Sequence, residues 1–300
     1  MPLTNARNKF LGGGRLPVPV PALGAEKISN GNFETWVSAT DAGSWGESAS
    51  GGSSVNREAA SVHGGTYAAR IDFDASANAY MSQASNLANN EWCLVESWMR
   101  TSASGKTMYI ALGAVTGKTR DPGTTWTQYF DVLRTAANNP SLTLAKVSAA
   151  SASIYFDDVS VKAITLASMF SVRSYGTHTT TKVGVTIVAG TRAGVVCNLD
   201  SATSPANFVI ASHDGSLCRL TKCVAGTYTE LISTSVAYAP GAYVEIRRPV
   251  GGDIWQLYYN GSKVGADQTI SDAAIKAATL AGLFNTYAGN TLTGFSCVPS

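Results

Sequence analysis

Carboxylates that stand close together are the first residues that could do chemistry, because hydrolysis of a glycosidic bond uses two of them. Asp72 and Asp74 lie two residues apart on one face of an expected strand, where an exposed-edge or turn-capping role is the favoured interpretation. The sequence has no Gly-x-Ser-x-Gly nucleophile motif, and its three histidines fall in turn-like surroundings. We therefore expect no enzymatic activity, with a hidden glycosidase as the minor alternative.

Cysteine chemistry is equally restricted. The chain has five cysteines, an odd number, and their spacing matches no common zinc-binding pattern. Buried, reduced thiols that pack as small apolar side chains are the expectation, and a disulfide between Cys218 and Cys223 is the alternative.

The composition excludes two classes of partner. Charged residues make up only 14% of the 300 residues, and the 22 basic and 20 acidic side chains are spread along the chain. No basic face for nucleic acid is therefore expected. No apolar run approaches the roughly 20 residues that a spanning helix needs, so we expect no membrane insertion.

The elements that must position any site are strands. From residue 28 onward, short segments with period-two alternation are separated by clusters of Gly, Asn, Asp and Ser. Segments of this kind recur in both halves of the chain, at 67–73, 93–99, 108–112, 153–161, 182–188, 193–199, 207–211 and 243–247. The sequence therefore predicts an all-β protein, and its length favours two consecutive sandwiches that pack directly, since no linker separates them.

Six short motifs in the first half occur in a recognisable order. NGNFE at 30–34 and IYFDDVS at 154–160 bracket the region, and GSWG, HGGTYA, SWMR and TTWTQ follow one another between them. Residues 28–163 thereby resemble the family 4/9-type carbohydrate-binding modules. The resemblance implies a β-jelly roll whose first and last strands lie close together.

The resemblance also implies site residues. Family members often hold a structural calcium between the first and last strands, and this site would take side-chain oxygens of Glu34 and Asp157 and carbonyl oxygens of Asn32 and Thr66. His63 stands where some members have an acidic residue, and a plain salt-bridge or hydrogen-bond cluster is the alternative. Tyr80 matches a position where family members often carry a ligand-stacking aromatic residue, and Gln83 and Tyr109 are further carbohydrate-binding candidates. Trp45, Trp98 and Trp126 match core positions.

The second half, residues 164–300, reads as another sandwich. An Asn260-Gly261 dipeptide between two alternating segments predicts a tight β-hairpin. This half resembles the concanavalin A-like or laminin G-like sandwiches. The resembled glucan-hydrolysing relatives carry a Glu-x-Asp-x-x-Glu strand, which is absent here.

Residues 1–27 suggest where the protein works. Gly12 to Gly14 followed by prolines at 17, 19 and 21 predict an extended arm. It is either a disordered leader or a peptide that docks on a larger partner, with Phe10, Leu11 and Leu16 as apolar anchors. Residues 1–11 lack the apolar run of a secretory signal, so export by that route is not expected. A phage virion protein, made in the host cytoplasm and acting outside it, fits both features. We expect a homo-oligomeric adhesin attached to other virion proteins through the arm; the alternatives are a purely structural head or tail component and a bacterial carbohydrate-binding accessory protein.

Overall fold

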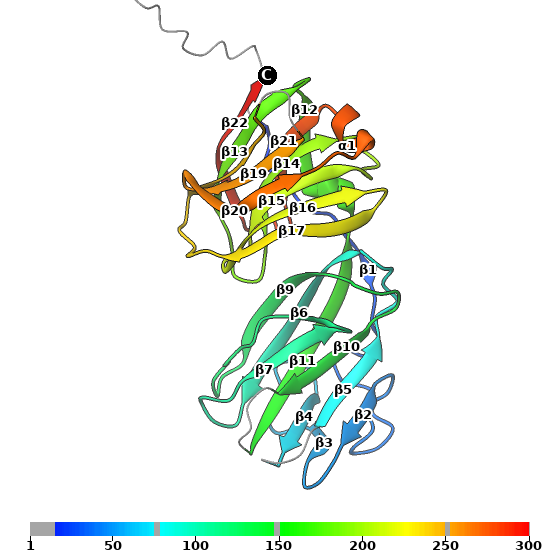
Figure 1. The fold of residues 1–300 in the computed structure, drawn as a ribbon. Helices are drawn as coiled ribbons and strands as arrows, with labels where there is room; N and C mark the ends of the chain where they lie inside the picture. The colour runs from blue at the N-terminus through cyan, green and yellow to red at the C-terminus, as the bar shows by residue number, and fades with distance from the viewer. Residues whose placement is uncertain (1–15, 75–78, 147–150, 250–252, 300) are drawn as a thin grey trace, which may run out of the picture.

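The computed structural model describes residues 16–74, 79–146, 151–249 and 253–299. These residues form antiparallel strands almost throughout, joined by one 3-10 turn, Leu166–Met169, and one short helix, α1 (Ala273–Ala277). The two lobes in Figure 1 hold the two halves of the chain. The predicted all-β sandwich fold is thus confirmed. Within the described ranges no helix has the length and apolar character needed to cross a bilayer.

The first lobe is a sandwich of two sheets whose strands interleave in the sequence, as in a jelly roll. One sheet has the order β3-β4-β11-β6-β9, and β1 also pairs with β11. The strands are β1 (Leu23–Glu26), β3 (Ser54–Glu58), β4 (Ala68–Phe73), β6 (Trp92–Thr101), β9 (Thr127–Arg134) and β11 (Ala152–Ile164). The facing sheet has the order β2-β5-β10-β7-β8, with β2 (Gly46–Ala49), β5 (Ala79–Ala84), β7 (Met108–Leu112), β8 (Val115–Thr116) and β10 (Ser141–Lys146).

Alternation decides which side chains enter the core between these sheets. Successive side chains of a strand point to opposite faces, so Met81, Ile110 and Leu142 face inward while their neighbours face out. Phe33 and Trp45, from the connection between β1 and β2, close the core. Trp45 is therefore a core residue, as predicted.

The second lobe is also a sandwich of two antiparallel sheets. Its six-stranded sheet has the order β12-β21-β14-β15-β16-β17, made of β12 (Phe170–Ser174), β14 (Ala193–Leu199), β15 (Phe208–His213), β16 (Leu217–Val224), β17 (Thr227–Ser235) and β21 (Leu280–Asn285). The facing sheet, β20-β19-β18-β13-β22, consists of β13 (His178–Thr186), β18 (Ala242–Arg247), β19 (Ile254–Tyr259), β20 (Ser262–Thr269) and β22 (Thr291–Pro299). Here, however, β14 to β17 follow one another in one sheet and β18 to β20 in the other. The concanavalin A-like character of this lobe stays a prediction.

Two local predictions in this half can be compared with the structure. Asn260 and Gly261 form the β19–β20 turn with φ of 47° and 83°, as a two-residue hairpin requires, so the predicted hairpin is confirmed. All five cysteines are free. Cys218 and Cys223 lie on the single strand β16, so the alternative of a disulfide across a hairpin is wrong.

The two sandwiches pack directly on each other through a third apolar cluster. From the first it contains Trp92, Leu94 and Val132, and from the second the outer face of the six-stranded sheet, including Phe208 and Phe284. Strand β14 is buried at every position, because one of its faces enters the second core and the other enters this junction.

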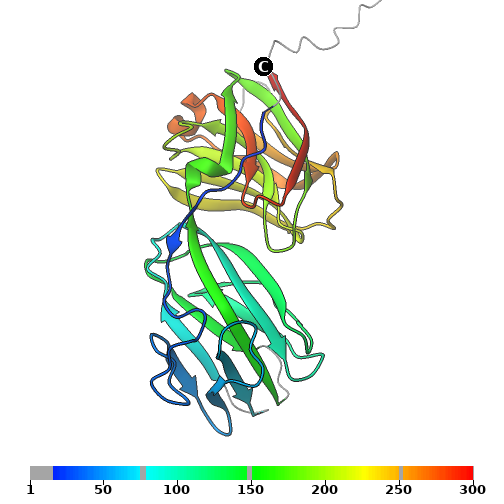
Figure 2. The same ribbon diagram turned by 180° about the vertical axis from the view of Figure 1, so that it is seen from behind.

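The N-terminal arm differs from the prediction. Residues 16–22 run along the second sandwich before the chain enters β1 beside the first (Figure 2). Leu16 is buried in the second core, and Asn285 Nδ2 donates a hydrogen bond to the carbonyl of Pro19 at 2.9 Å. Leu16 therefore anchors this segment to the second sandwich of the same chain, because its side chain is buried in that core and is not free to contact a partner. The predicted anchors Phe10 and Leu11 lie outside the described residues.

Candidate functional site

Tyr80 and Tyr109 stand on one row across the outer face of the sheet β2-β5-β10-β7-β8. Tyr80 lies opposite Ala145 of β10, which in turn lies opposite Tyr109 of β7. Strands are about 4.8 Å apart, so the two tyrosine Cα atoms are separated by about 10 Å with a small residue between them. Tyr80 is 40% exposed, which is uncommon for a large aromatic side chain of this protein.

Hydroxyl groups surround these rings. Ser48 continues the row beyond Tyr80, and the neighbouring row carries Ser82, Thr143 and Thr116 at register positions on the same face. Aromatic rings flanked by hydrogen-bonding groups suit a pyranose ring, which presents C–H groups on one face and hydroxyls at its edge. We call the residues Ser48, Tyr80, Ser82, Tyr109, Thr143 and Ala145 the tyrosine platform.

Gln83 does not belong to the tyrosine platform, although the sequence predicted it there. It follows core residue Met81 by two positions, so strand alternation places it on the inner side of β5. Its amide is already occupied: the oxygen accepts from Ser29 N at 2.6 Å, and Nε2 donates to the carbonyls of Ser29 and Ser44. Gln83 therefore fixes two loops at the end of the sheet.

The second candidate site forms where the two bracketing motifs meet. Gly31 lies so close to β11 that a Cβ at this position would be 1.9 Å from the carbonyl oxygen of Val159, and its own carbonyl accepts from Val159 N. Asn30 adopts φ of 49° and ties the loop together through its side-chain amide. NGNFE is therefore a packing motif that brings Glu34 toward the 63–67 loop.

Two predicted calcium ligands, Glu34 and Asp157, hold that loop from both ends. Glu34 Oε1 accepts from the N–H groups of Thr66 and Tyr67, at 2.8 and 3.0 Å. Asp157 Oδ2 accepts from the N–H groups of His63 and Gly64, at 3.0 and 3.2 Å. In this arrangement both carboxylates act as backbone-binding groups.

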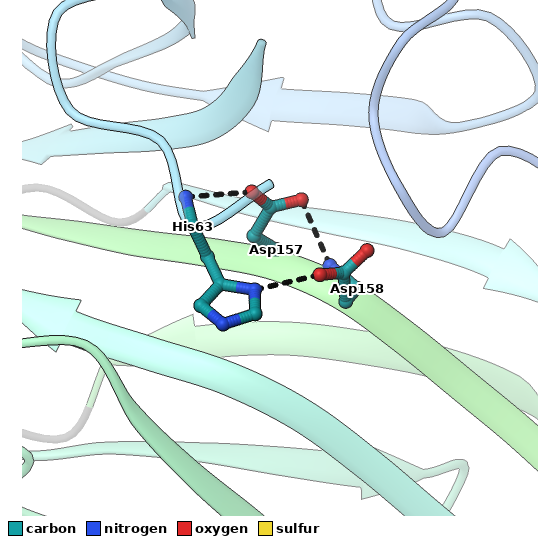
Figure 3. Close-up of side chains that lie close together, drawn as sticks. All are labelled: His63, Asp157 and Asp158. Atoms are coloured by element: carbon teal, nitrogen blue, oxygen red, sulfur yellow. Dashed lines mark hydrogen bonds and ion pairs between the residues drawn. The ribbon is translucent and has the colours of Figure 1, made fainter. Parts of the chain in front are cut away.

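His63, Asp157 and Asp158 converge at a bulge of β11 (Figure 3). His63 Nδ1 lies 2.7 Å from Asp158 Oδ2, and one ligand atom from each of the three residues lies within 4.8 Å of the others. Burial raises the pKa of Asp157 to about 6, although the N–H groups of Gly64, His63 and Asp158 lower it. Neighbouring Asp158 raises it further.

The donor set fits a hard cation in part. Calcium prefers six to eight oxygens, and the carboxylates of Glu34, Asp157 and Asp158 supply oxygens of the required kind. Glu34 lies outside the three-residue cluster, however, and His63 offers a nitrogen, which calcium rarely takes. The predicted set of Asn32, Glu34, Thr66 and Asp157 stays a prediction.

An aromatic cluster on the outer face of the other sheet was not predicted. His63 stacks on Trp98 with ring centres 3.7 Å apart, and Trp126 meets both His63 and Tyr155 edge-on. Trp98 and Trp126 were predicted to lie in the core, but both are half-buried on this outer face and belong to none of the apolar clusters. The sequence did contain a signal for Trp98. It directly precedes core residue Met99 in the same strand, so alternation places its side chain on the opposite, outer face.

Three carboxylates considered for hydrolysis already have hydrogen-bond or ion-pair partners. Asp72 Oδ2 accepts from Arg70 and Asn56, and its Oδ1 accepts from Ser153. Glu230 pairs with Arg219, and the buried Glu245 pairs with Arg247. These hydrogen bonds and ion pairs stabilise pairs of neighbouring strands.

Comparison with known proteins gives structural neighbours. No protein-family model and no curated protein matches the sequence. Among solved structures, a carbohydrate-binding module, CBM66, from Bacillus subtilis is 15% identical over 43% of this chain and 77% of its own, with a TM-score of 0.34. The family 11 module from Clostridium thermocellum is 13% identical over 47% and 95%, with a TM-score of 0.34. The CBM22-1 xylan-binding domain of Paenibacillus barcinonensis Xyn10C is 12% identical over 49% and 98%, with a TM-score of 0.33. These neighbours are carbohydrate-binding modules of families 66, 11 and 22.

Proposed function

We propose that this chain is a non-catalytic glycan-binding protein whose ligand lies across the tyrosine platform. The observation that carries the proposal is the row Tyr80–Ala145–Tyr109, in which two outward-facing rings flank a small residue. The bonded states of Asp72, Glu230 and Glu245 support a binding role over hydrolysis.

Alanine substitution at the tyrosine platform tests this function. We expect Tyr80→Ala and Tyr109→Ala each to weaken binding to a responsive polysaccharide by about threefold to tenfold, the loss of one stacked ring. Affinity gel electrophoresis against soluble β-glucans and xylans, after a glycan-array screen, measures the effect. Tyr80→Phe keeps the ring and should bind nearly as the parent does.

Tyr243→Ala provides the matched control, because Tyr243 is similarly exposed but lies on β18 of the second sandwich. Equal losses in the control and the platform variants would contradict the proposal. So would the absence of binding to every glycan by the folded parent protein.

The wider setting that we propose is a phage particle, on which the chain is an adhesin or accessory protein. Direct packing of the two sandwiches supports this role, since a firm junction suits the display of a binding face at a distance. Detection of the chain in purified virions by mass spectrometry tests the setting. Its presence in virions without any glycan binding would favour the purely structural alternative. Secretion by a bacterium with polysaccharide-degrading enzymes would favour the accessory-protein alternative.

A further inference from the structure

A cavity of about 630 Å³ lies at the junction of the two sandwiches. The first sandwich contributes residues 131–136 of β9 and its continuation, together with 115–118, and the second contributes 190–192, Asp214 and Tyr228. Sites for small ligands usually measure about 300–1,000 Å³ and often occur between domains. The tyrosine platform shares no residue with this cavity.

Basic side chains dominate the lining. They are Lys118, Arg134, Arg192 and Arg219. Arg219 is neutralised by Asp214 at 3.0 Å and by Glu230 at 3.2 Å. Arg134 and Arg192, in contrast, take part in no ion pair within the described part of the chain.

Both acidic side chains of the cavity lining already form ion pairs with arginines. Asp131 pairs with Arg120 at 2.9 Å, and Asp214 pairs with Arg219. Arg134 Nη1 donates to the neutral amide oxygen of Asn90 at 2.9 Å, and the nearby carboxylate of Glu230 acts on Arg134 without forming an ion pair with it in the described part of the chain. Four basic and two acidic side chains thus line the cavity, and the resulting excess of positive charge is offset only in part by nearby Glu230.

Arg134 and Arg192 both lie against Trp92, and the guanidinium carbon of Arg134 lies closer still, 4.2 Å, to the ring centre of Tyr228. Their guanidinium carbons lie 6.0 and 5.1 Å from the centre of the Trp92 indole. Desolvation lowers the pKa of Arg192 to about 10, with Arg219 as a further cause, and desolvation also lowers the pKa of Arg134. Repulsion by Arg134 also lowers the pKa of Arg192, and a bound anion would relieve this repulsion.

Neutral donors complete the site. Tyr228 OH accepts a hydrogen bond from Trp92 Nε1 at 3.1 Å, and its own proton has no acceptor among the described residues. Asn89 and Thr227 add an amide and a hydroxyl group to the lining, whereas the hydroxyl of Thr135 already donates to the carbonyl of Ala88. Two guanidinium groups and several neutral donors are what an oxyanion requires, because guanidinium pairs with carboxylate, sulfate or phosphate through two parallel hydrogen bonds.

We propose that this cavity binds the oxyanion group of a small ligand, with Arg134 and Arg192 as its principal donors. The group is a carboxylate, a sulfate or a phosphate. The site goes beyond glycan binding at the tyrosine platform and does not depend on it.

Calorimetric titration of the full chain tests the proposal. Sodium sulfate, sodium phosphate and sodium glucuronate are titrated separately at constant ionic strength in sodium chloride, with D-glucose as the neutral probe. We expect at least one anion to bind with one-to-one stoichiometry, and the preferred anion identifies the source of the oxyanion. Glucose should not bind. No binding by any of the three anions, or equal binding of glucose and glucuronate at this site, overturns the proposal.

Charge-removing variants locate the binding. We expect Arg192→Gln and Arg134→Gln each to weaken the preferred anion at least tenfold, whereas Arg192→Lys retains part of the affinity. Arg173→Gln is the matched control, since Arg173 is an exposed arginine of β12 outside the cavity. An equal loss in the Arg173 variant overturns the proposal.

Unliganded stability separates a binding role from a packing role. If Arg192 is retained for a ligand, Arg192→Gln should leave the melting temperature without anion unchanged or raise it, because an uncompensated charge is removed. A lowered melting temperature together with unchanged anion affinity would assign Arg192 to packing against Trp92 and overturn the proposal.

Discussion

Asp157 shows how one residue links packing and acid–base behaviour. Its side chain is fully buried, and three backbone N–H groups donate to it. Its pKa of about 6 lies above the ordinary value of 3.8. The protonated form is therefore favoured by folding: this contribution to stability is fully present below about pH 3.8 and is lost as the pH rises through 6.

A cation at this place would reverse the penalty, because it favours the ionised carboxylate. We expect calcium chloride to raise the melting temperature of the chelator-treated protein near pH 7.5, and to do so much less near pH 5, where Asp157 is protonated. Differential scanning calorimetry at the two pH values measures the difference. Asp157→Asn and Glu34→Gln should each reduce the response, and magnesium chloride serves as the ionic control. An identical response to calcium and magnesium, or none to either, would contradict a calcium site.

At the scale of elements, alternation carried much of what could be predicted. It located strands in both halves and the Asn260-Gly261 turn, because these depend on local patterns. Gln83 was assigned to the wrong face of β5, because alternation alone does not say which of the two faces of that strand enters the core. The stack of His63 on Trp98 joins residues 35 apart in the sequence, across a loop whose path no local pattern specifies.

The segment 16–22 illustrates the same limit and yields a prediction. Its extended form follows from alternating prolines, but its partner is the second sandwich, which only the three-dimensional arrangement reveals. We expect Leu16→Ala to lower the free energy of unfolding by about 2 kcal/mol, the usual loss for truncating a buried leucine. Urea denaturation measures it. Val20→Ala is the control, since Val20 is 69% exposed in the same segment and its truncation should change little.

Equal effects of the Leu16 and Val20 substitutions would show that burial of Leu16 does not stabilise the protein. Because residues 16–22 pack on the second sandwich, deletion of residues 2–15 alone is the appropriate test of docking on a partner, since it leaves the packed segment in place. Removal of residues 2–27 would also remove Leu16 and strand β1, so that loss of attachment and loss of stability could not be told apart.

For the whole molecule, the junction decides whether two sandwiches behave as one unit. Trp92 is buried there, donates to Tyr228 OH and lies edge-on to Phe284. Phe130 and Tyr287 stack with ring centres 4.5 Å apart, and Val132 N donates to the carbonyl of Gly190. Shared burial of this extent couples the unfolding of the two halves, because neither can open without exposing the apolar face of the other.

Removal of Trp92 tests that coupling. We expect Trp92→Ala to cost about 3–5 kcal/mol and to split a single calorimetric transition into two, because each sandwich keeps its own core while their common surface loses its largest side chain. Trp98→Ala is the control of equal size. Trp98 lies on the outer face of the same strand β6 and outside the junction cluster, so its loss should lower stability without splitting the transition.

If both variants retain one transition, the coupling does not depend on Trp92 and must reside in the surrounding contacts, such as those of Val132 and Phe130. If the parent protein itself unfolds in two steps, the sandwiches are independent despite their contact, and the junction contributes to binding geometry rather than to cooperative stability.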